Sequence, residues 1–124
     1  MKIIKASKPN DLIKIENLAH VIWNEHYPPI IGKPQVDYML KKFQTANYMA
    51  QQVSEGFHYY LIIFNTIEIG YISIKKEQHS LFLSKLYLLK TYRGKGFGKK
   101  AMAFVYKKAE EMKCKSISLT VNRN

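Results

Sequence analysis

The sequence has few acidic residues, one cysteine and no long apolar stretch. Only 9 of its 124 residues are Asp or Glu, against 20 Lys and Arg, so the formal net charge is +11. The single cysteine, Cys114, excludes an internal disulfide framework and fits a reducing cytoplasm. No apolar run approaches the roughly 18 residues that a membrane-spanning helix needs. Residues 1–5 are too few and too charged to be the apolar part of a secretion signal.

The remaining composition is that of an ordinary globular domain. Apolar residues make up 47% of the chain, which is enough for a core, and the length predicts a single domain over residues 1–124. The positive charge favours an anionic partner, such as a phosphorylated ligand or a nucleic acid. The lysines are spread along the chain in pairs, a pattern typical of solvated faces, so a nucleic-acid partner is not favoured. The four histidines show no metal-ligand spacing, and no metal site is predicted.

Apolar periodicity and turn residues predict alternating helices and strands. The expected strands are residues 2–6, 57–64, 67–74, 80–89 and 116–121. The first expected helix starts near residue 9, carries an apolar stripe to Trp23 and ends before Pro28-Pro29. The other expected helices are residues 34–48 and 97–113, with loops at 51–56 and 75–79. The predicted order is therefore β-α-α-β-β-β-α-β, an α/β fold.

The stretch from Leu86 to Lys100 combines a strand end, three glycines at alternate positions and the start of a helix. The first N–H groups of a helix have no partner inside it, and the helix dipole adds partial positive charge there. Glycines lack a Cβ, so a phosphate can approach these amides closely. Arg93, Lys95 and Lys99 add full positive charges. The stretch predicts a binding site for a pyrophosphate.

The glycine spacing decides which pyrophosphate ligand is favoured. A Walker loop needs four residues between its first and second glycine, but Gly94 and Gly98 enclose three. A dinucleotide fingerprint needs G-x-G-x-x-G and an acidic residue about 20 positions later, and neither is present. The pattern Arg-x-x-Gly-x-Gly is matched by Arg93, Gly96 and Gly98. Together with Leu86-Tyr87-Leu88 before it, this motif resembles the acetyl-CoA signature of the GCN5-related N-acetyltransferase (GNAT) family; the alternative is an ordinary glycine-rich turn.

The resemblance implies a mixed, mostly antiparallel sheet with helices on both faces, and acetyl-CoA as co-substrate. The strand at 86–88 would diverge from the strand at 116–121 and pair with the pantetheine arm, and a backbone N–H of Leu86 or Leu88 would polarise the thioester carbonyl. The acetyl group would pass by direct attack to a primary amine of a small molecule or protein. The residues that the resemblance assigns to coenzyme A are Leu86, Tyr87, Leu88, Arg93, Gly94, Lys95, Gly96, Phe97, Gly98, Lys99 and Asn122.

The base that deprotonates the acceptor is less well defined. Many members of the family carry a glutamate on the strand before the glycine loop, whereas Ser84 and Lys85 occupy that region here. Glu25 and His26, after the first helix, are the candidate catalytic residues, because a histidine of ordinary pKa accepts a proton near neutral pH. Deprotonation of the acceptor through water is the alternative.

Members of the family are expected to continue past the strand at 116–121 with a helix bearing a tyrosine and two closing strands. The shortened chain is therefore expected to be impaired in catalysis and to form a homodimer through the open strand edge at Ser116–Val121. The rival interpretation is a non-catalytic module that binds coenzyme A or an anionic partner such as RNA.

Overall fold

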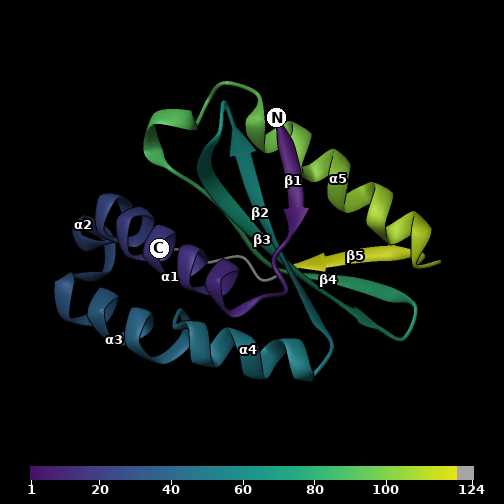
Figure 1. Cartoon of the computed structure of the whole chain (residues 1–124), viewed down its shortest axis with the longest axis horizontal. Helices are drawn as coiled ribbons and strands as arrows, with labels where there is room; N and C mark the ends of the chain where they lie inside the picture. The colour runs from purple at the N-terminus through teal and green to yellow at the C-terminus, as the bar shows by residue number, and fades with distance from the viewer. Residues whose placement is uncertain (120–124) are drawn as a thin grey trace.

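The computed structural model describes residues 1–119, and in them a five-stranded sheet carries helices on both faces (Figure 1). The strand order is β1-β2-β3-β4-β5, in which β5 runs parallel to β4 and the other neighbours are antiparallel. The elements are β1 (Lys2–Lys5), α1 (Pro9–His26), α2 (Pro28–Ile31), α3 (Lys33–Phe43), α4 (Ala46–Ser54), β2 (Phe57–Phe64), β3 (Ile67–Glu77), β4 (Ser80–Leu88), the 3-10 turn η1 (Lys90–Tyr92), α5 (Phe97–Glu111) and β5 (Ser116–Leu119). The predicted fold class, a mixed, mostly antiparallel sheet with helices on both faces, is confirmed.

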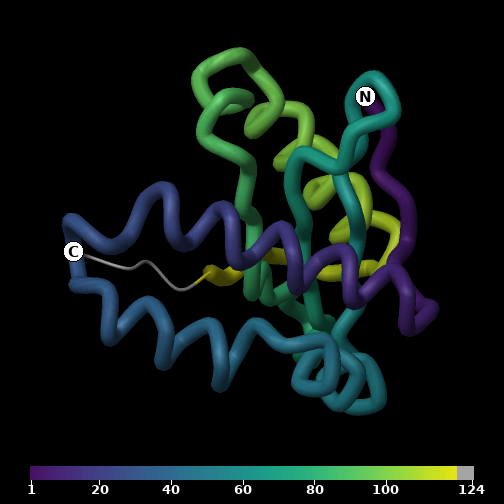
Figure 2. Tube along the Cα trace, turned by 60° about the vertical axis from the view of Figure 1, so that its left-hand side comes forward, coloured from purple at the N-terminus to yellow at the C-terminus, as the bar shows by residue number. Residues whose placement is uncertain are grey.

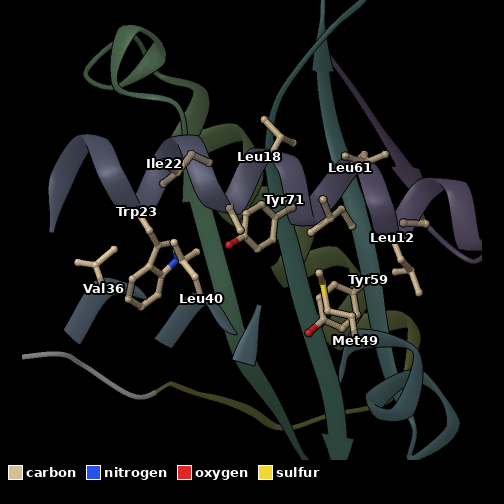
Figure 3. Close-up of a cluster of buried hydrophobic side chains, with 13 residues drawn as sticks. Leu12, Leu18, Ile22, Trp23, Val36, Leu40, Met49, Tyr59, Leu61 and Tyr71 are labelled. Atoms are coloured by element: carbon tan, nitrogen blue, oxygen red, sulfur yellow. The ribbon is translucent and has the colours of Figure 1, made fainter. Parts of the chain in front are cut away.

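The sheet separates two apolar cores. Helix α1 and the α3–α4 pair run side by side over one face (Figure 2), and α5 covers the other. Central strands are therefore buried on both faces: Tyr59 and Leu61 of β2 point to the α1 side, while Tyr60 and Ile62 point to the α5 side. Figure 3 shows this first core, in which Trp23 of α1 lies beside Val36 and Leu40 of α3.

The segment between β1 and β2 differs most from the prediction. The helix predicted over 34–48 is two helices, and the loop predicted over 51–56 is wrong because α4 continues to Ser54. Helix α4 begins where it does because Thr45 caps it, with its Oγ1 accepting from the Tyr48 amide at 3.1 Å. The Glu16 carboxylate of α1 accepts from the Ala46 amide at 2.6 Å. Strand β3 also runs three residues into the turn predicted over 75–79, since it ends at Glu77.

The strand edge predicted to join two copies of the chain lies only partly within the described residues. Residues 116–119 form β5, the outer strand of the described sheet, whereas residues 120 and 121 lie outside the described residues. A contact between copies along this edge stays a prediction.

Strands β3 and β4 approach each other closely at Gly70. A Cβ at this position would lie 2.2 Å from the Tyr87 carbonyl oxygen and 2.9 Å from Cδ2 of Leu88. We therefore expect Gly70→Ala to lower the free energy of unfolding by about 3 kcal/mol, because the backbone of β4 must move. Urea denaturation followed by circular dichroism measures this. Gly98→Ala is the control, since a Cβ there meets no atom within 4 Å; equal losses in both variants would contradict the close approach at Gly70.

Candidate functional site: a strand edge and a glycine loop

The second half of β4 has one edge that pairs with no strand within residues 1–119. Ser73 pairs with Lys85 and Ile74 pairs with Leu83, so Ser84 forms a bulge in the ladder. On its other side, β4 pairs with β5 only from Ser80 to Leu83. Among residues 1–119, therefore, no strand pairs with this edge at residues 84–88. The Leu88 carbonyl in this stretch accepts from the Arg93 side chain. The resemblance to the GNAT family predicts the pantetheine arm along this edge.

The glycine loop leads from this strand into α5 (Figure 1, green segment between β4 and α5). Gly94 and Gly96 have φ of +72° and +87°, a conformation that side chains strain to adopt, and Gly96 is the N-cap of α5. No side chain caps this helix, and the Lys100 amide makes the bond to the Gly96 carbonyl, at 3.2 Å. The amides of the first turn before Lys100 thus lack an intrahelical partner, as an anion site requires.

The three glycines leave open space around this helix start. A Cβ built at Gly94, Gly96 or Gly98 meets no atom within 4 Å. Gly98 does not have a positive φ, so a glycine is not needed there for the backbone conformation. Its lack of a side chain leaves space beside the backbone amides. The neighbouring Phe97 contributes its backbone only, because its ring is buried against Phe64 and Tyr92.

A cleft of about 340 Å³ joins the strand edge to the loop. It is lined by His26, Tyr27, Leu86, Tyr87, Leu88, Arg93 and Gly98. Six of these seven were predicted site residues, drawn from three separate elements. Lys95 and Lys99 are exposed on the loop and helix beside it, and Asn122 lies outside the described residues.

Arg93 ties the two sides of the cleft together. Its Nε donates to the Leu88 carbonyl at 3.2 Å, and its Nη1 lies 3.2 Å from Nδ1 of His26. Because a guanidinium can only donate, Nδ1 of His26 accepts, and neutral His26 carries its ring proton on Nε2. In that tautomer the Nδ1 lone pair of His26 is engaged by Arg93, and the contact holds the end of α1 against the loop.

Glu25 is also held in place by the loop. Its Oε1 accepts from the Lys90 amide at 3.1 Å, which fastens the end of α1 to η1. The structure brings both predicted catalytic residues beside the glycine loop, in the last turn of α1 rather than in a loop after it. Each of them is engaged there by a partner from the glycine loop.

Two tyrosines of the cleft stay protonated over a wide pH range. Burial raises the pKa of Tyr27 and, more strongly, that of Tyr87. Tyr27 was not predicted from the sequence, although its position directly before Pro28-Pro29 marks the end of α1. Trp23 packs against Tyr27 in a tilted arrangement with ring centroids 4.4 Å apart, which supports the tyrosine at the cleft wall.

Lys85 is a buried polar residue that the sequence did not single out. Its side chain leaves β4 just after the bulge, and only 7% of the residue is exposed. Its Nζ donates to the Phe43 carbonyl at 2.9 Å and to the Tyr59 hydroxyl at 2.8 Å. The Tyr59 hydroxyl in turn donates to Oε1 of Gln52. This chain of contacts connects β4 to the end of α3, to β2 and to α4.

Comparison with known proteins accounts for the arrangement of strand, loop and helix. The sequence profile described as Acetyltransferase (GNAT) family matches residues 16–124. The chain belongs to the GNAT acetyltransferase family. No curated protein sequence matches it significantly. No helix in residues 1–119 is long and apolar enough to cross a membrane, and no group of three or more His, Cys, Asp or Glu side chains in that range is placed to hold a metal ion.

Solved structures share the fold at low sequence identity. The PaiA N-acetyltransferase of Thermoplasma acidophilum, determined in complex with coenzyme A, superposes with a TM-score of 0.86 at 18% identity over 100% of this chain and 82% of that one. A GCN5-related N-acetyltransferase of Rhodopseudomonas palustris gives a TM-score of 0.80 at 12% identity, over 99% and 74%. A GNAT family acetyltransferase of Staphylococcus aureus gives 0.64 at 17% identity, over 99% and 89%.

Proposed function

We propose that this GNAT domain is an acetyl-CoA-dependent N-acetyltransferase that transfers the acetyl group to a primary amine of a small molecule or protein. The observation that carries the proposal is the continuity of the open edge of β4 with the uncapped start of α5 through one cleft. A long ligand with an amide-bearing arm at one end and a pyrophosphate at the other fits this combination. Membership of the family and the coenzyme A complex of the PaiA enzyme support the same ligand.

The residues present fit coenzyme A in two respects. The unpartnered amides before Lys100 and the open space at Gly98 suit the pyrophosphate, with Lys95 and Lys99 beside it. A backbone N–H on the edge at 84–88 would polarise the thioester carbonyl and stabilise the negative charge that develops on its oxygen. Bound acetyl-CoA supplies the activated acetyl group and the thiolate leaving group.

Direct attack by the amine is favoured over an acetyl-enzyme intermediate. Cys114 is the single thiol of the chain, and it follows α5 next to β5. Its Sγ lies 3.9 Å from the Met112 carbonyl, and it does not line the cleft. The two substrates must therefore be bound together, and the kinetics should be sequential.

The test begins with coenzyme A affinity, measured by calorimetry on the whole chain. Thiol release from acetyl-CoA is then followed with spermidine, an aromatic monoamine, an amino acid and a lysine peptide. We expect micromolar binding, turnover of at least one amine, and unchanged turnover in Cys114→Ser. Binding without thiol release would favour the non-catalytic module. The proposal would be contradicted if the chain did not bind coenzyme A but bound RNA with an affinity that falls steeply as the salt concentration rises.

A further inference from the structure

A groove of about 390 Å³ lies between α1 and the start of β3. Four residues of α1, from Lys14 to Val21, line it at the spacing of a single helix face. Ile67 and Glu68 of β3, together with Leu89 after β4, form the rest of its lining. None of the lining residues lines the cleft of the candidate site or belongs to β5. The groove is therefore a separate surface of the molecule.

The groove contains apolar side chains that the fold leaves uncovered. Val21 of α1 and Ile67 of β3 are each 48% exposed, and Leu89 beside them is half-buried. A single exposed apolar residue is ordinary on a protein surface. Apolar residues from separate elements that gather in one groove are instead typical of a contact surface.

Two opposite charges line the same groove. Lys14 is exposed and Glu68 is half-buried, and in residues 1–119 neither takes part in a salt bridge. Glu68 is one of only nine acidic residues in a chain of net charge +11, so most of the surface repels a second copy. A half-buried carboxylate beside apolar side chains is stabilised by a cation that reaches it. The groove thus carries both the acid and the base of an ion pair.

These features fit a second copy of the chain better than a different partner. In a two-fold dimer the same patch meets itself, so each group must find its complement within that patch. Lys14 of one copy and Glu68 of the other form such a pair, which the symmetry supplies twice. The long apolar stem of a lysine lets its amine reach into a neighbouring groove. An acidic partner would instead be drawn to the lysine-rich faces, where no carboxylate opposes it.

We propose that this groove is a self-association surface, at which two copies of the chain meet about a two-fold axis with Lys14 of each copy paired to Glu68 of the other. The uncovered apolar side chains of the two grooves face each other between these pairs. Leu89 leads directly into η1, so the contact lies next to the base of the glycine loop without filling the cleft. The inference goes beyond the proposed function and does not depend on it, because it concerns the association of the chain alone.

The first experiment is sedimentation velocity of the wild type, Lys14→Glu and Glu68→Lys. We expect the wild type to pass from monomer to dimer between about 1 and 200 µM, since a contact built on one groove is small. Each exchange should weaken the dimer tenfold or more, because it places two like charges opposite each other in both pairs. Lys107→Glu and Glu77→Lys are the matched controls: they make the same charge changes at exposed positions away from the groove and should associate like wild type.

The deciding sample is an equimolar mixture of the two single variants. The Lys14→Glu chain carries acids at both positions and the Glu68→Lys chain carries bases at both, so in a mixed dimer every acid faces a base again. The mixture should therefore dimerise with an affinity within about threefold of wild type, although each component alone associates weakly. The chain with both exchanges should likewise associate with itself. Circular dichroism on each variant checks that the fold is retained.

A wild type that stays monomeric up to about 200 µM would overturn the proposal. Dimers of unchanged strength in both single variants would also overturn it and would place the contact elsewhere, such as the predicted edge of β5. Weak association that is not recovered in the mixture would show that Lys14 and Glu68 do not meet, and the proposal would again fail. Coenzyme A affinity and thiol release are measured separately, so the proposed function stands or falls on other data.

Discussion

Gly98→Val is expected to lower the affinity for coenzyme A by tenfold or more and to leave the fold unchanged. Gly98 lies in the first turn of α5, where the backbone amides lack partners, and a Cβ there points into open space. A branched side chain would occupy the volume through which a phosphate reaches these amides. Loss of one charge-assisted hydrogen bond corresponds to about 1.5–3 kcal/mol. Calorimetry with coenzyme A measures the loss directly.

Gly98 is a cleaner test than Gly96. Gly96 has a φ of +87°, so a side chain there would strain the loop whether or not a ligand is bound. Gly98→Ala should give a smaller loss than Gly98→Val, because its methyl group fills less of the space. Ala103→Val is the matched control, since it adds a branched residue to an exposed position of the same helix, away from the loop. Equal affinity in folded Gly98→Val and wild type would show that the phosphates lie elsewhere.

The glycine loop could be predicted from the sequence because all of its determinants are local. Strand end, alternate glycines and helix start follow one another within fifteen residues, and backbone amides supply the chemistry. The strands were predictable for the same reason: β2 is Phe57–Phe64 as expected, since its β-branched and aromatic run is bounded by turn residues. Family membership followed from the same stretch.

The groups that depend on contacts between distant segments were not predictable. The start of α4 has a local cap in Thr45, but it is also fastened to α1 by Glu16, which lies 30 residues before the amide that it accepts from. The partners of Lys85 come from residues 26 and 42 positions away, so its burial cannot be read from the residues that flank it. Glu25 and His26 lie beside the glycine loop, and their partners on it, 65 and 67 positions away, could be seen only in the fold.

Lys85→Met is expected to remove a pH dependence of stability that the wild type shows between pH 7 and pH 9. The pKa of Lys85 is about 7 in the folded chain, against an ordinary value of 10.5. Between these values the unfolded chain binds more protons than the folded one, so the free energy of unfolding rises with pH. The stabilisation is complete above the unfolded value and is lost as the pH falls toward 7. From pH 7 to pH 9 the wild type should gain about 2 kcal/mol.

Urea denaturation at pH 7, 8 and 9 measures this gain, and the variant should show a nearly flat profile. At pH 7 the variant should be the more stable protein, because methionine fills similar volume without a charge to bury. The window ends at pH 9 because burial raises the pKa values of Tyr59, Tyr71 and Tyr87, and these shifts lower stability near and above their ordinary value of 10.0. Lys76→Met controls for the loss of one positive charge. A wild type whose stability does not change from pH 7 to pH 9 would show that burial does not lower the pKa of Lys85 in the folded chain.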